Sequence, residues 1–359
     1  MKQLLYVFCF LLLISPVFAQ EADEELTELL EEYLYDDEPG VVIYAAYDGE
    51  AWVARYGLAN LDTGEEIAID DLFRIASVTK PLVATVVLQL VDEGEIGLDD
   101  PIADYLPANI VDEIENANEA TVRQMLQMTS GIFDYTESDD FFDAVEDDPN
   151  YMWTAEEVLE FAYGEEPYSG AGDDYYYSNT NYILAQLIIE SVTGNSLADE
   201  LDSRIFETAG MDSCYLETAE RFAEGIVRGY QWGDDDDYED ITEISDGTGL
   251  GDGGVICSAE DLAKFLPALM DGEYLEDDTL EEMLDTVSDG EGGEYGLGIG
   301  YDDTEYGMML SHDGASSGFQ SVMAYIPDED IVVVILTNDF DSEIMEDLTY
   351  DVLDFMWED

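Results

Sequence analysis

Residues 73–81 read FRIASVTKP, and a long apolar segment follows them. Pro81 lacks an N–H and is tolerated only in the first turn of a helix, so it places a helix start close to Ser77. From Ser77 to Val91 the apolar positions form two adjacent stripes, which are Leu82, Val86 and Leu90, and Val83, Val87 and Val91. Two stripes are too broad for a surface helix. We therefore expect a central, buried helix that begins near Ser77.

Ser77 and Lys80 have the spacing of a nucleophile and its base. At a helix start, the dipole and the free N–H groups favour negative charge developing near the serine. Lys80 lies three residues on, on the same face, and burial against the apolar stripes would lower its pKa enough for it to act as a base. The alternative is a helix-capping serine beside a surface lysine. Only eight basic residues follow residue 19, which favours the functional interpretation.

The rest of the chain predicts strands at both ends with helices between them. Residues 23–36 have the pattern of an amphipathic helix, and two strands, Val41–Tyr47 and Ala51–Tyr56, meet at Asp48-Gly49, a hairpin signal. The middle is mainly helical, with helices expected at Thr121–Met128, Ala155–Phe161 and Thr180–Thr193. In the last third, strands are expected at Tyr295–Tyr301, Met308–Ser311, Phe319–Ile326 and Ile331–Thr337, followed by a helix from Ser342.

This order indicates an α+β fold. Strands at both ends suggest one antiparallel sheet, flanked by helices and built from the two chain ends, with a mainly helical domain inserted. We expect the sheet domain to comprise residues 20–105 and 290–359, and the helical insertion residues 106–289.

The composition is very acidic. The 359 residues include 89 Asp and Glu against 9 Lys and Arg and one His, a formal charge of −80, yet 47% are hydrophobic. This apolar content can fill a core, so the chain is expected to fold. The charge excludes nucleic acids and anionic membranes as ordinary partners, because it repels both. Either adaptation to molar salt or deliberate supercharging of an ordinary scaffold would explain it, and the sequence does not separate the two.

The first 19 residues have the pattern of a cleaved signal peptide. Lys2 supplies a positive start, Leu4–Ile14 is apolar, and residues 17–19 fit a cleavage site before Gln20, which predicts a secreted or periplasmic protein. Cys214 and Cys257 then remain in the mature chain. They could form a disulfide, but two cysteines this far apart are more often unpaired.

Metal and cofactor chemistry is not expected. A zinc site needs three or four ligands, and the two cysteines do not cluster with His312, the single histidine. No glycine-rich phosphate loop stands between a strand and a helix. Residues 314–318 match a G-x-S-x-G nucleophile elbow, but that fold needs its histidine after the serine, and none lies beyond 312.

Two further segments give the serine–lysine pair a context. Tyr177-Ser178-Asn179 precedes a helix about 100 residues on, and His312-Asp313-Gly314 adjoins a late strand. This order resembles that of the serine β-lactamase and penicillin-binding-protein superfamily, in its class C-like branch with DD-peptidases, esterases and D-aminopeptidases. The resemblance runs from about 38 to 355, and supporting stretches are Met128–Gly131, Gly251–Leu262, Tyr295–Gly298 and Gly318-Phe319.

The resemblance implies a role for each matching position. Ser77 would attack a carbonyl to form an acyl-enzyme, with Lys80 as its base and Tyr177 as the acid for the leaving group. The N–H groups of Ser77 and Ala315 would form the oxyanion hole, and Gly314 would let the strand approach. Asn179 would bind the acyl amide of the substrate. His312 would orient Tyr177 or contact the leaving group.

The third motif departs from that of class C β-lactamases, which have lysine where this chain has His312. A mostly neutral histidine provides no permanent cation for the carboxylate of a β-lactam. The expected enzyme is therefore a secreted serine hydrolase of small esters or peptides, DD-carboxypeptidase-like or esterase-like. A class C-like β-lactamase and a non-hydrolytic penicillin- or peptidoglycan-binding module are the alternatives.

The negative field should also make activity depend on salt. It raises the pKa of Lys80, and salt shortens the Debye length from about 30 Å at 0.01 M to about 3 Å at 1 M. We expect stability and kcat/KM both to rise from low to molar salt, in thermal unfolding and in steady-state assays. A flat or falling salt profile with an intact fold would contradict this.

Overall fold

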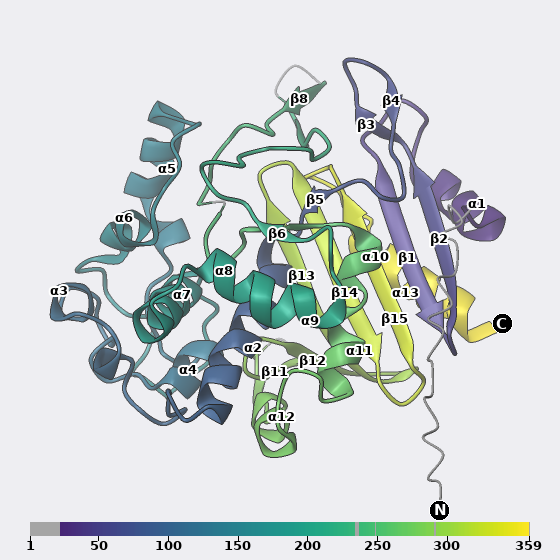
Figure 1. Cartoon of the computed structure of the whole chain (residues 1–359). Coiled ribbons are helices and arrows are strands. Elements are labelled where there is room, and N and C mark those ends of the chain that lie inside the picture. The colour runs from purple at the N-terminus through teal and green to yellow at the C-terminus, as the bar shows by residue number, and fades with distance from the viewer. Residues whose placement is uncertain (1–21, 234–236, 248, 291, 359) are drawn as a thin grey trace, which may run out of the picture.

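The sheet that the sequence predicts from the two chain ends is present in the computed structural model, which describes residues 22–233, 237–247, 249–290 and 292–358. Its eight strands lie in the order β10-β11-β12-β13-β14-β15-β1-β2, and every neighbouring pair is antiparallel. The strands are β1 Val41–Tyr47, β2 Glu50–Tyr56, β10 Val287–Ser288, β11 Glu294–Tyr295, β12 Gly300–Thr304, β13 Gly307–Ser316, β14 Phe319–Ile326 and β15 Ile331–Thr337. Figure 1 shows β1 beside β15, so the two ends of the chain share one sheet.

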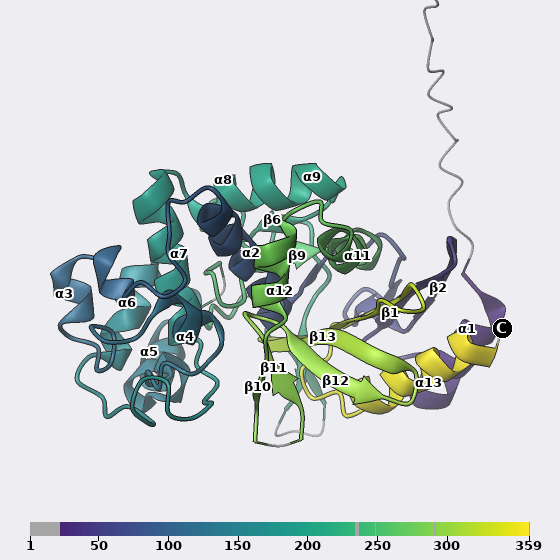
Figure 2. The same ribbon diagram turned by 90° about the horizontal axis from the view of Figure 1, so that it is seen from below.

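Two helices from opposite ends of the chain cover one face of this sheet. They are α1, Glu24–Tyr33, and α13, Met345–Glu358, and Figure 2 shows them together below the strands. Tyr33 of α1 donates a hydrogen bond to Asp351 of α13, and Tyr306 beside β13 donates one to Asp354. In a chain with few cations, tyrosine hydroxyls thus donate to two carboxylates of α13.

The other face of the sheet packs against the helical part of the chain. The helix after Ser77 is α2, Thr79–Asp92, and eleven of its fourteen residues are buried, as the two apolar stripes predict. It contacts α7, Thr180–Thr193, which ends at Gly194 in the left-handed conformation. Figure 1 places α3 to α7 beside the sheet, and Figure 2 places α8, α9 and α11 on the face opposite α13. No helix among the described residues is long and apolar enough to cross a membrane.

The remaining helices are short. They are α3 Ala108–Val111, α4 Val122–Leu126, α5 Asp139–Asp147, α6 Ala155–Leu159, α8 Leu197–Leu201, α9 Glu207–Ala209, α10 Ala259–Leu262, α11 Phe265–Met270 and α12 Asp277–Met283. Thr121 and Thr154 cap α4 and α6 with reciprocal capping boxes, which explains why these helices begin where the sequence predicts.

Several boundaries differ from the sequence prediction, among them the following three in the last third of the chain. The strand expected over Tyr295–Tyr301 is two strands, β11 and β12, because Gly298 has φ +85° and turns the chain back between them. β13 continues past Ser311 to Ser316, so the histidine motif lies inside a strand. The last helix begins at Met345 and not at Ser342.

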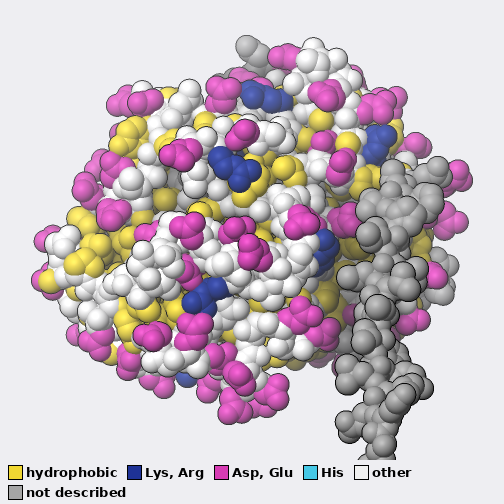
Figure 3. Space-filling view, in the orientation of Figure 1, with side chains coloured by type: hydrophobic (Ala, Val, Ile, Leu, Met, Phe, Trp, Pro, Cys, Tyr) yellow, Lys and Arg dark blue, Asp and Glu magenta, His cyan; other side chains and the backbone are white. Residues whose placement is uncertain are grey.

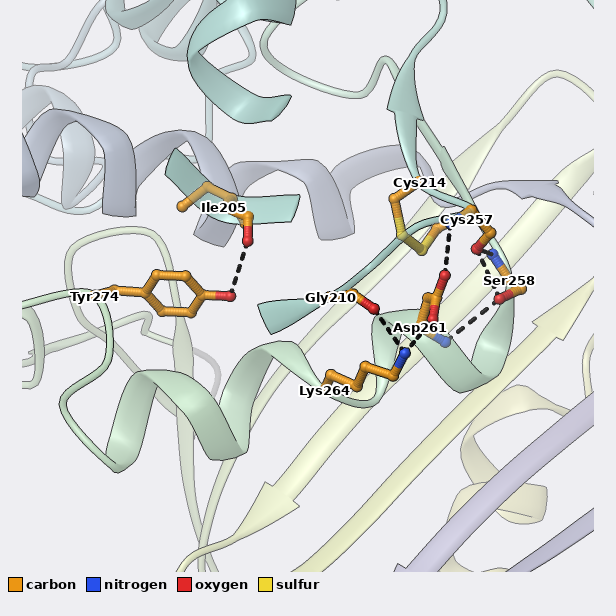
Figure 4. Close-up of a disulfide and its surroundings, with 9 residues drawn as sticks. Ile205, Gly210, Cys214, Cys257, Ser258, Asp261, Lys264 and Tyr274 are labelled. Atoms are coloured by element: carbon orange, nitrogen blue, oxygen red, sulfur yellow. Dashed lines mark hydrogen bonds and ion pairs between the residues drawn. A yellow bond between two sulfur atoms is a disulfide. The ribbon is translucent and has the colours of Figure 1, made fainter. Parts of the chain in front are cut away.

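Cys214 and Cys257 form a disulfide, so the preference for unpaired cysteines was wrong. Cys257 ends β9, Val255–Cys257, which pairs antiparallel with β6, Tyr215–Leu216. Cys214 directly precedes β6 and therefore lies opposite Cys257, with the two Cα atoms 4.2 Å apart. Figure 4 shows the disulfide beside α10, where Lys264 donates to the carbonyl of Gly210.

Removing this disulfide should destabilise the protein. Its loop of 43 residues corresponds to about 4 kcal/mol of lost chain entropy in the unfolded state. We expect the Cys214→Ser/Cys257→Ser double variant to unfold at a lower denaturant concentration than the oxidised parent. The measurement is chemical denaturation of both proteins. Equal stability of the double variant and of the oxidised parent would contradict the assignment.

Candidate active site

Ser77 lies in a tight turn between a short strand and the central helix. β5, Phe73–Arg74, pairs with β9, and the 3-10 turn η1, Ala76–Val78, leads into α2. Ala76 has φ +46°, a left-handed conformation that is strained for a residue with a Cβ atom. Two hydrogen bonds, one on each side of Ser77, hold this turn to Val255 of β9. The N–H of Ile75 donates to the carbonyl of Val255, and the N–H of Val255 donates to Thr79 Oγ1.

The Lys80 ammonium reaches Ser77 directly. Lys80 Nζ is 3.0 Å from Ser77 Oγ, 2.8 Å from Asn179 Oδ1 and 2.6 Å from the carbonyl oxygen of Asp252. An ammonium group has three donors, and these three acceptors use them all. When Lys80 is neutral, two N–H bonds to Asn179 and Asp252 would leave its lone pair directed at Ser77 Oγ.

Lys80 differs from the other cations that the structure describes. The other seven basic residues after the predicted signal peptide each lie within 4.0 Å of a carboxylate: Arg55, Arg74, Arg123, Arg204, Arg221, Arg228 and Lys264. Figure 3 shows such cations beside carboxylates on one face of the molecule. Lys80 has no such ion pair among the described residues, although the chain contains 89 acids. A buried cation without a directly bonded carboxylate is costly, which is typical of a catalytic lysine.

Burial lowers the pKa of Lys80 to about 8, as the sequence predicted in direction. Desolvation is the largest cause, because the side chain is fully buried. The charges of Asp252, Asp134 and Asp313 act in the opposite direction and keep the pKa from falling further. An amine with a pKa near neutrality is suited to proton transfer at physiological pH.

Asn179 connects Lys80 to a buried carboxylate. Its Nδ2 donates to Asp134 Oδ2 at 3.0 Å, while its Oδ1 accepts from Lys80. Although Asn179 directly precedes α7, its side chain makes no capping bond to that helix. The side chain of Asn179 therefore bonds within the site and does not cap the helix.

Tyr177 packs against the same lysine. Lys80 Nζ lies 5.0 Å from the centre of the Tyr177 ring, and the hydroxyl interacts with Ser77. The residue is 36% exposed, but its hydroxyl points into the cluster, where desolvation raises its pKa well above the usual value and the interaction with Ser77 opposes this. Tyr177 is therefore a neutral proton donor at physiological pH.

His312 lies beside Tyr177 without bonding to it. The two ring centres are 6.4 Å apart, and both imidazole nitrogens are used elsewhere. Nδ1 lies 2.6 Å from the carbonyl of Asp313, which can only accept, so Nδ1 carries the proton and Nε2 accepts from Tyr295. Burial lowers the pKa of His312 to about 4, and the Lys80 charge adds to this, so the imidazole is neutral.

Gly314 brings β13 next to the serine. A Cβ atom at this position would lie 2.7 Å from both Ser77 N and the carbonyl of Ile75, so only glycine allows the approach. Pairing of β12 with β13 ends at Ser311, which leaves the edge of residues 312–316 open towards the site. Ser77, Asn179 and Ala315 all line one cavity of about 250 Å³. The structure thus brings together every site residue that the sequence predicts.

The carboxylates around Lys80 were missed by sequence reasoning. Asp252 bonds the Tyr135 hydroxyl at 2.8 Å, and burial raises its pKa to about 6. Asp134 and Asp252 fall within or just after stretches that carry the family resemblance, which is the one signal that could have found them. The G-x-S-x-G match forms the tight turn between β13 and β14 and not a strand-to-helix elbow. Among the described residues, no group of three His, Cys, Asp or Glu side chains is arranged to hold a metal ion.

Comparison with known proteins decides the family. The family described as Beta-lactamase matches residues 26–355, nearly the whole chain. The chain belongs to this family. It is thus a serine hydrolase of the β-lactamase family, and the resemblance drawn from its three motifs is confirmed.

Similar proteins within the family have different named activities. The chain is 28% identical to penicillin-binding protein 4 of Amycolatopsis lactamdurans, over 84% of this chain and 81% of that protein. It is 27% identical to a D-aminopeptidase of Brucella anthropi, of which it spans 56%. Among solved structures, the D-amino acid amidase of Ochrobactrum anthropi SV3 superimposes with a TM-score of 0.80 at 27% identity, over 93% of this chain and 98% of that one. These likenesses support the α+β fold and leave the substrate open.

Proposed function

We propose that this family member hydrolyses esters or amides with uncharged leaving groups, through an acyl-enzyme on Ser77. The observation that carries this proposal is Lys80, which is buried, is hydrogen-bonded to Ser77 Oγ and forms no ion pair among the described residues. A nucleophile needs such a base at hydrogen-bonding distance.

In the proposed acylation step, neutral Lys80 removes the proton of Ser77 as Oγ attacks the carbonyl carbon. The oxyanion forms between Ser77 and Ala315, whose N–H groups would stabilise it. Tyr177 then gives its proton to the leaving group, and the proton on Lys80 returns to Tyr177. Deacylation repeats these transfers with water as the nucleophile.

The third motif favours an uncharged leaving group. Because His312 is neutral and Asp313 is adjacent to it, this strand presents no cation to a substrate carboxylate. Among the described residues that line the cavity there is no lysine or arginine either. DD-carboxypeptidase substrates and β-lactams both carry a carboxylate, so an esterase or amidase is the better fit. We infer that His312 supports Tyr177 by packing.

A matched substrate pair tests this function. The protein would be assayed with a short D-amino acid peptide as the free acid and as its C-terminal amide, and cleavage of the same peptide bond would be followed in both, with nitrocefin for comparison. We expect the uncharged form to react at least about tenfold faster, and Ser77→Ala to abolish both reactions. Faster turnover of the free acid would contradict the preference. Activity undiminished in Ser77→Ala would overturn the proposal, and a persistent acyl label without turnover would indicate a trapping module.

The pKa of Lys80 predicts the pH dependence of the reaction. The base is the neutral amine, so kcat/KM for a neutral ester should rise with pH and level off above about 8. At pH 7 about a tenth of the lysine is neutral, and at pH 6 about a hundredth. Tyr177 stays protonated over this range because its pKa is raised. A profile that is flat from pH 6 to 9 would exclude Lys80 as the base.

We also propose that the protein is exported. The signal-like residues 1–19 lie outside the described residues, so this rests on their sequence pattern. The disulfide supports it, because disulfides persist mainly in oxidising compartments. N-terminal sequencing of the protein from its native host should begin at Gln20, whereas an intact Met1 in a cytoplasmic fraction would contradict export.

A further inference from the structure

The cavity beside Ser77 has an acidic and aromatic wall that the proposed reaction does not use. Asp246 and Asp252 both line it, together with the rings of Tyr135, Phe142 and Phe340. Neither Tyr177 nor His312 is among its lining residues, so it lies on the acyl side of the nucleophile and away from the leaving group.

Asp246 is fixed in place without a cation. Its Oδ2 accepts from both the N–H and the hydroxyl of Ser317, each at 2.8 Å. No lysine or arginine forms an ion pair with Asp246 among the residues that the structure describes. The second oxygen, Oδ1, accepts no hydrogen bond among the described residues, so it is able to accept one from a ligand. A held carboxylate without a counterion favours a cationic ligand.

A second observation at the same wall points to a ligand. Ser316 Oγ is buried and has no hydrogen-bond partner among the described residues. Alternation along β13 puts Ser316 on the same side as His312 and Gly314, which face the site. Buried hydroxyls are normally hydrogen-bonded, so the Ser316 hydroxyl in this cavity is available to bond a polar group of a ligand.

The aromatic side chains of the wall indicate that the ligand also has an apolar part. Phe142 is 57% exposed and Phe340 is 39% exposed, although both line the cavity. Exposed aromatic rings at the mouth of a cavity gain apolar contacts when a substrate covers them. An aromatic face also attracts an ammonium group.

We propose that this wall binds an acyl group that carries both a free ammonium and an apolar side chain. Asp246 and Ser316 would hold the ammonium, and Phe142 and Phe340 would contact the side chain. This rests on the proposed function and narrows its substrates to amides and esters of amino acids with an unblocked amine. An N-acylated substrate has no ammonium group and would therefore not form the proposed interaction with Asp246.

The test compares the p-nitroanilide of phenylalanine with its N-acetyl derivative, as both enantiomers, at pH 7. We expect the free amine to be preferred at least about tenfold, the effect of one charge-assisted hydrogen bond. The preference should persist at 2 M salt, where the field of distant charges is screened. A preference for the N-acetyl substrate would overturn the inference.

Two variants distinguish the effect of Asp246 in the cavity wall from the effect of the net charge of the protein. Asp246→Asn keeps an acceptor for Ser317 and should reduce the ratio of free-amine to N-acetyl kcat/KM at least about fivefold. Asp328→Asn removes the same charge from an exposed turn and should leave that ratio unchanged. An unchanged ratio in Asp246→Asn, or an equal fall in both variants, would contradict the assignment.

A measurement without variants covers the case in which Asp246→Asn does not fold. 2-Phenylethylamine should inhibit the parent enzyme competitively at least about tenfold more strongly than uncharged 2-phenylethanol. Equal inhibition would overturn the inference. If Ser77-dependent turnover occurs without any amine preference, the inference fails and the proposed function stands. If no substrate shows Ser77-dependent turnover, the proposed function itself fails.

Discussion

Replacing Lys80 by methionine is expected to lower kcat/KM by about a thousandfold. General base catalysis contributes about 10² to 10⁴, and Lys80 is the only base within hydrogen-bonding distance of Ser77 Oγ among the described residues. Methionine has nearly the same length and suits the buried site better than a charge does. The loss should therefore appear in catalysis and not in folding, as measured by steady-state kinetics beside circular dichroism.

Lys264→Met is the matched control for this variant. It removes a second lysine, but one that is paired with Asp261 and lies about 39% exposed at the surface. It should retain activity within about twofold, since surface pairs contribute little. If the two variants lost activity equally, overall charge and not a base at Lys80 would explain the result.

Replacing Tyr177 by phenylalanine should give the second-largest loss, about a hundredfold or more on amides. The hydroxyl is the proposed acid for the leaving group, and burial keeps it protonated. An amine leaves only when protonated, whereas p-nitrophenolate leaves without help. The variant should therefore lose much more activity on an amide than on a p-nitrophenyl ester of the same acyl group.

Tyr176→Phe controls for the loss of a neighbouring hydroxyl. Its ring stacks on Tyr168 and is 41% exposed, and among the described residues its side chain forms no hydrogen bond with Ser77 or Lys80. It should leave the ratio of amide to ester activity unchanged. Equal losses on both substrates in Tyr177→Phe would show that the tyrosine positions the site and does not donate the proton.

The elements that the sequence predicted are those with a long periodic pattern. α2 and α7 have continuous apolar faces and defined ends, at Pro81 and Gly194, and the β1–β2 hairpin has its turn signal at Asp48-Gly49. Short strands have no such pattern. β6 and β9 contain two and three residues, and their pairing, which places Cys214 opposite Cys257, depends on contacts far apart in the sequence.

The residues of the site also differ in whether the sequence could predict them. Ser77, Lys80, Tyr177 and His312 could be predicted because their order along the chain is specific and because lysine and histidine are rare here. Asp246 could not, because one acid among 89 carries no information by its type. Only the fold shows which carboxylates lack a cation and face the nucleophile.

The central claim is that Ser77 becomes acylated during turnover. The most direct measurement is the intact mass of the protein after acid quench of its reaction with an ester, followed by peptide mapping. The parent should gain the mass of the acyl group on the peptide that contains Ser77, and Ser77→Ala should gain none. An acyl group on another residue, or turnover by Ser77→Ala with no adduct, would contradict the account.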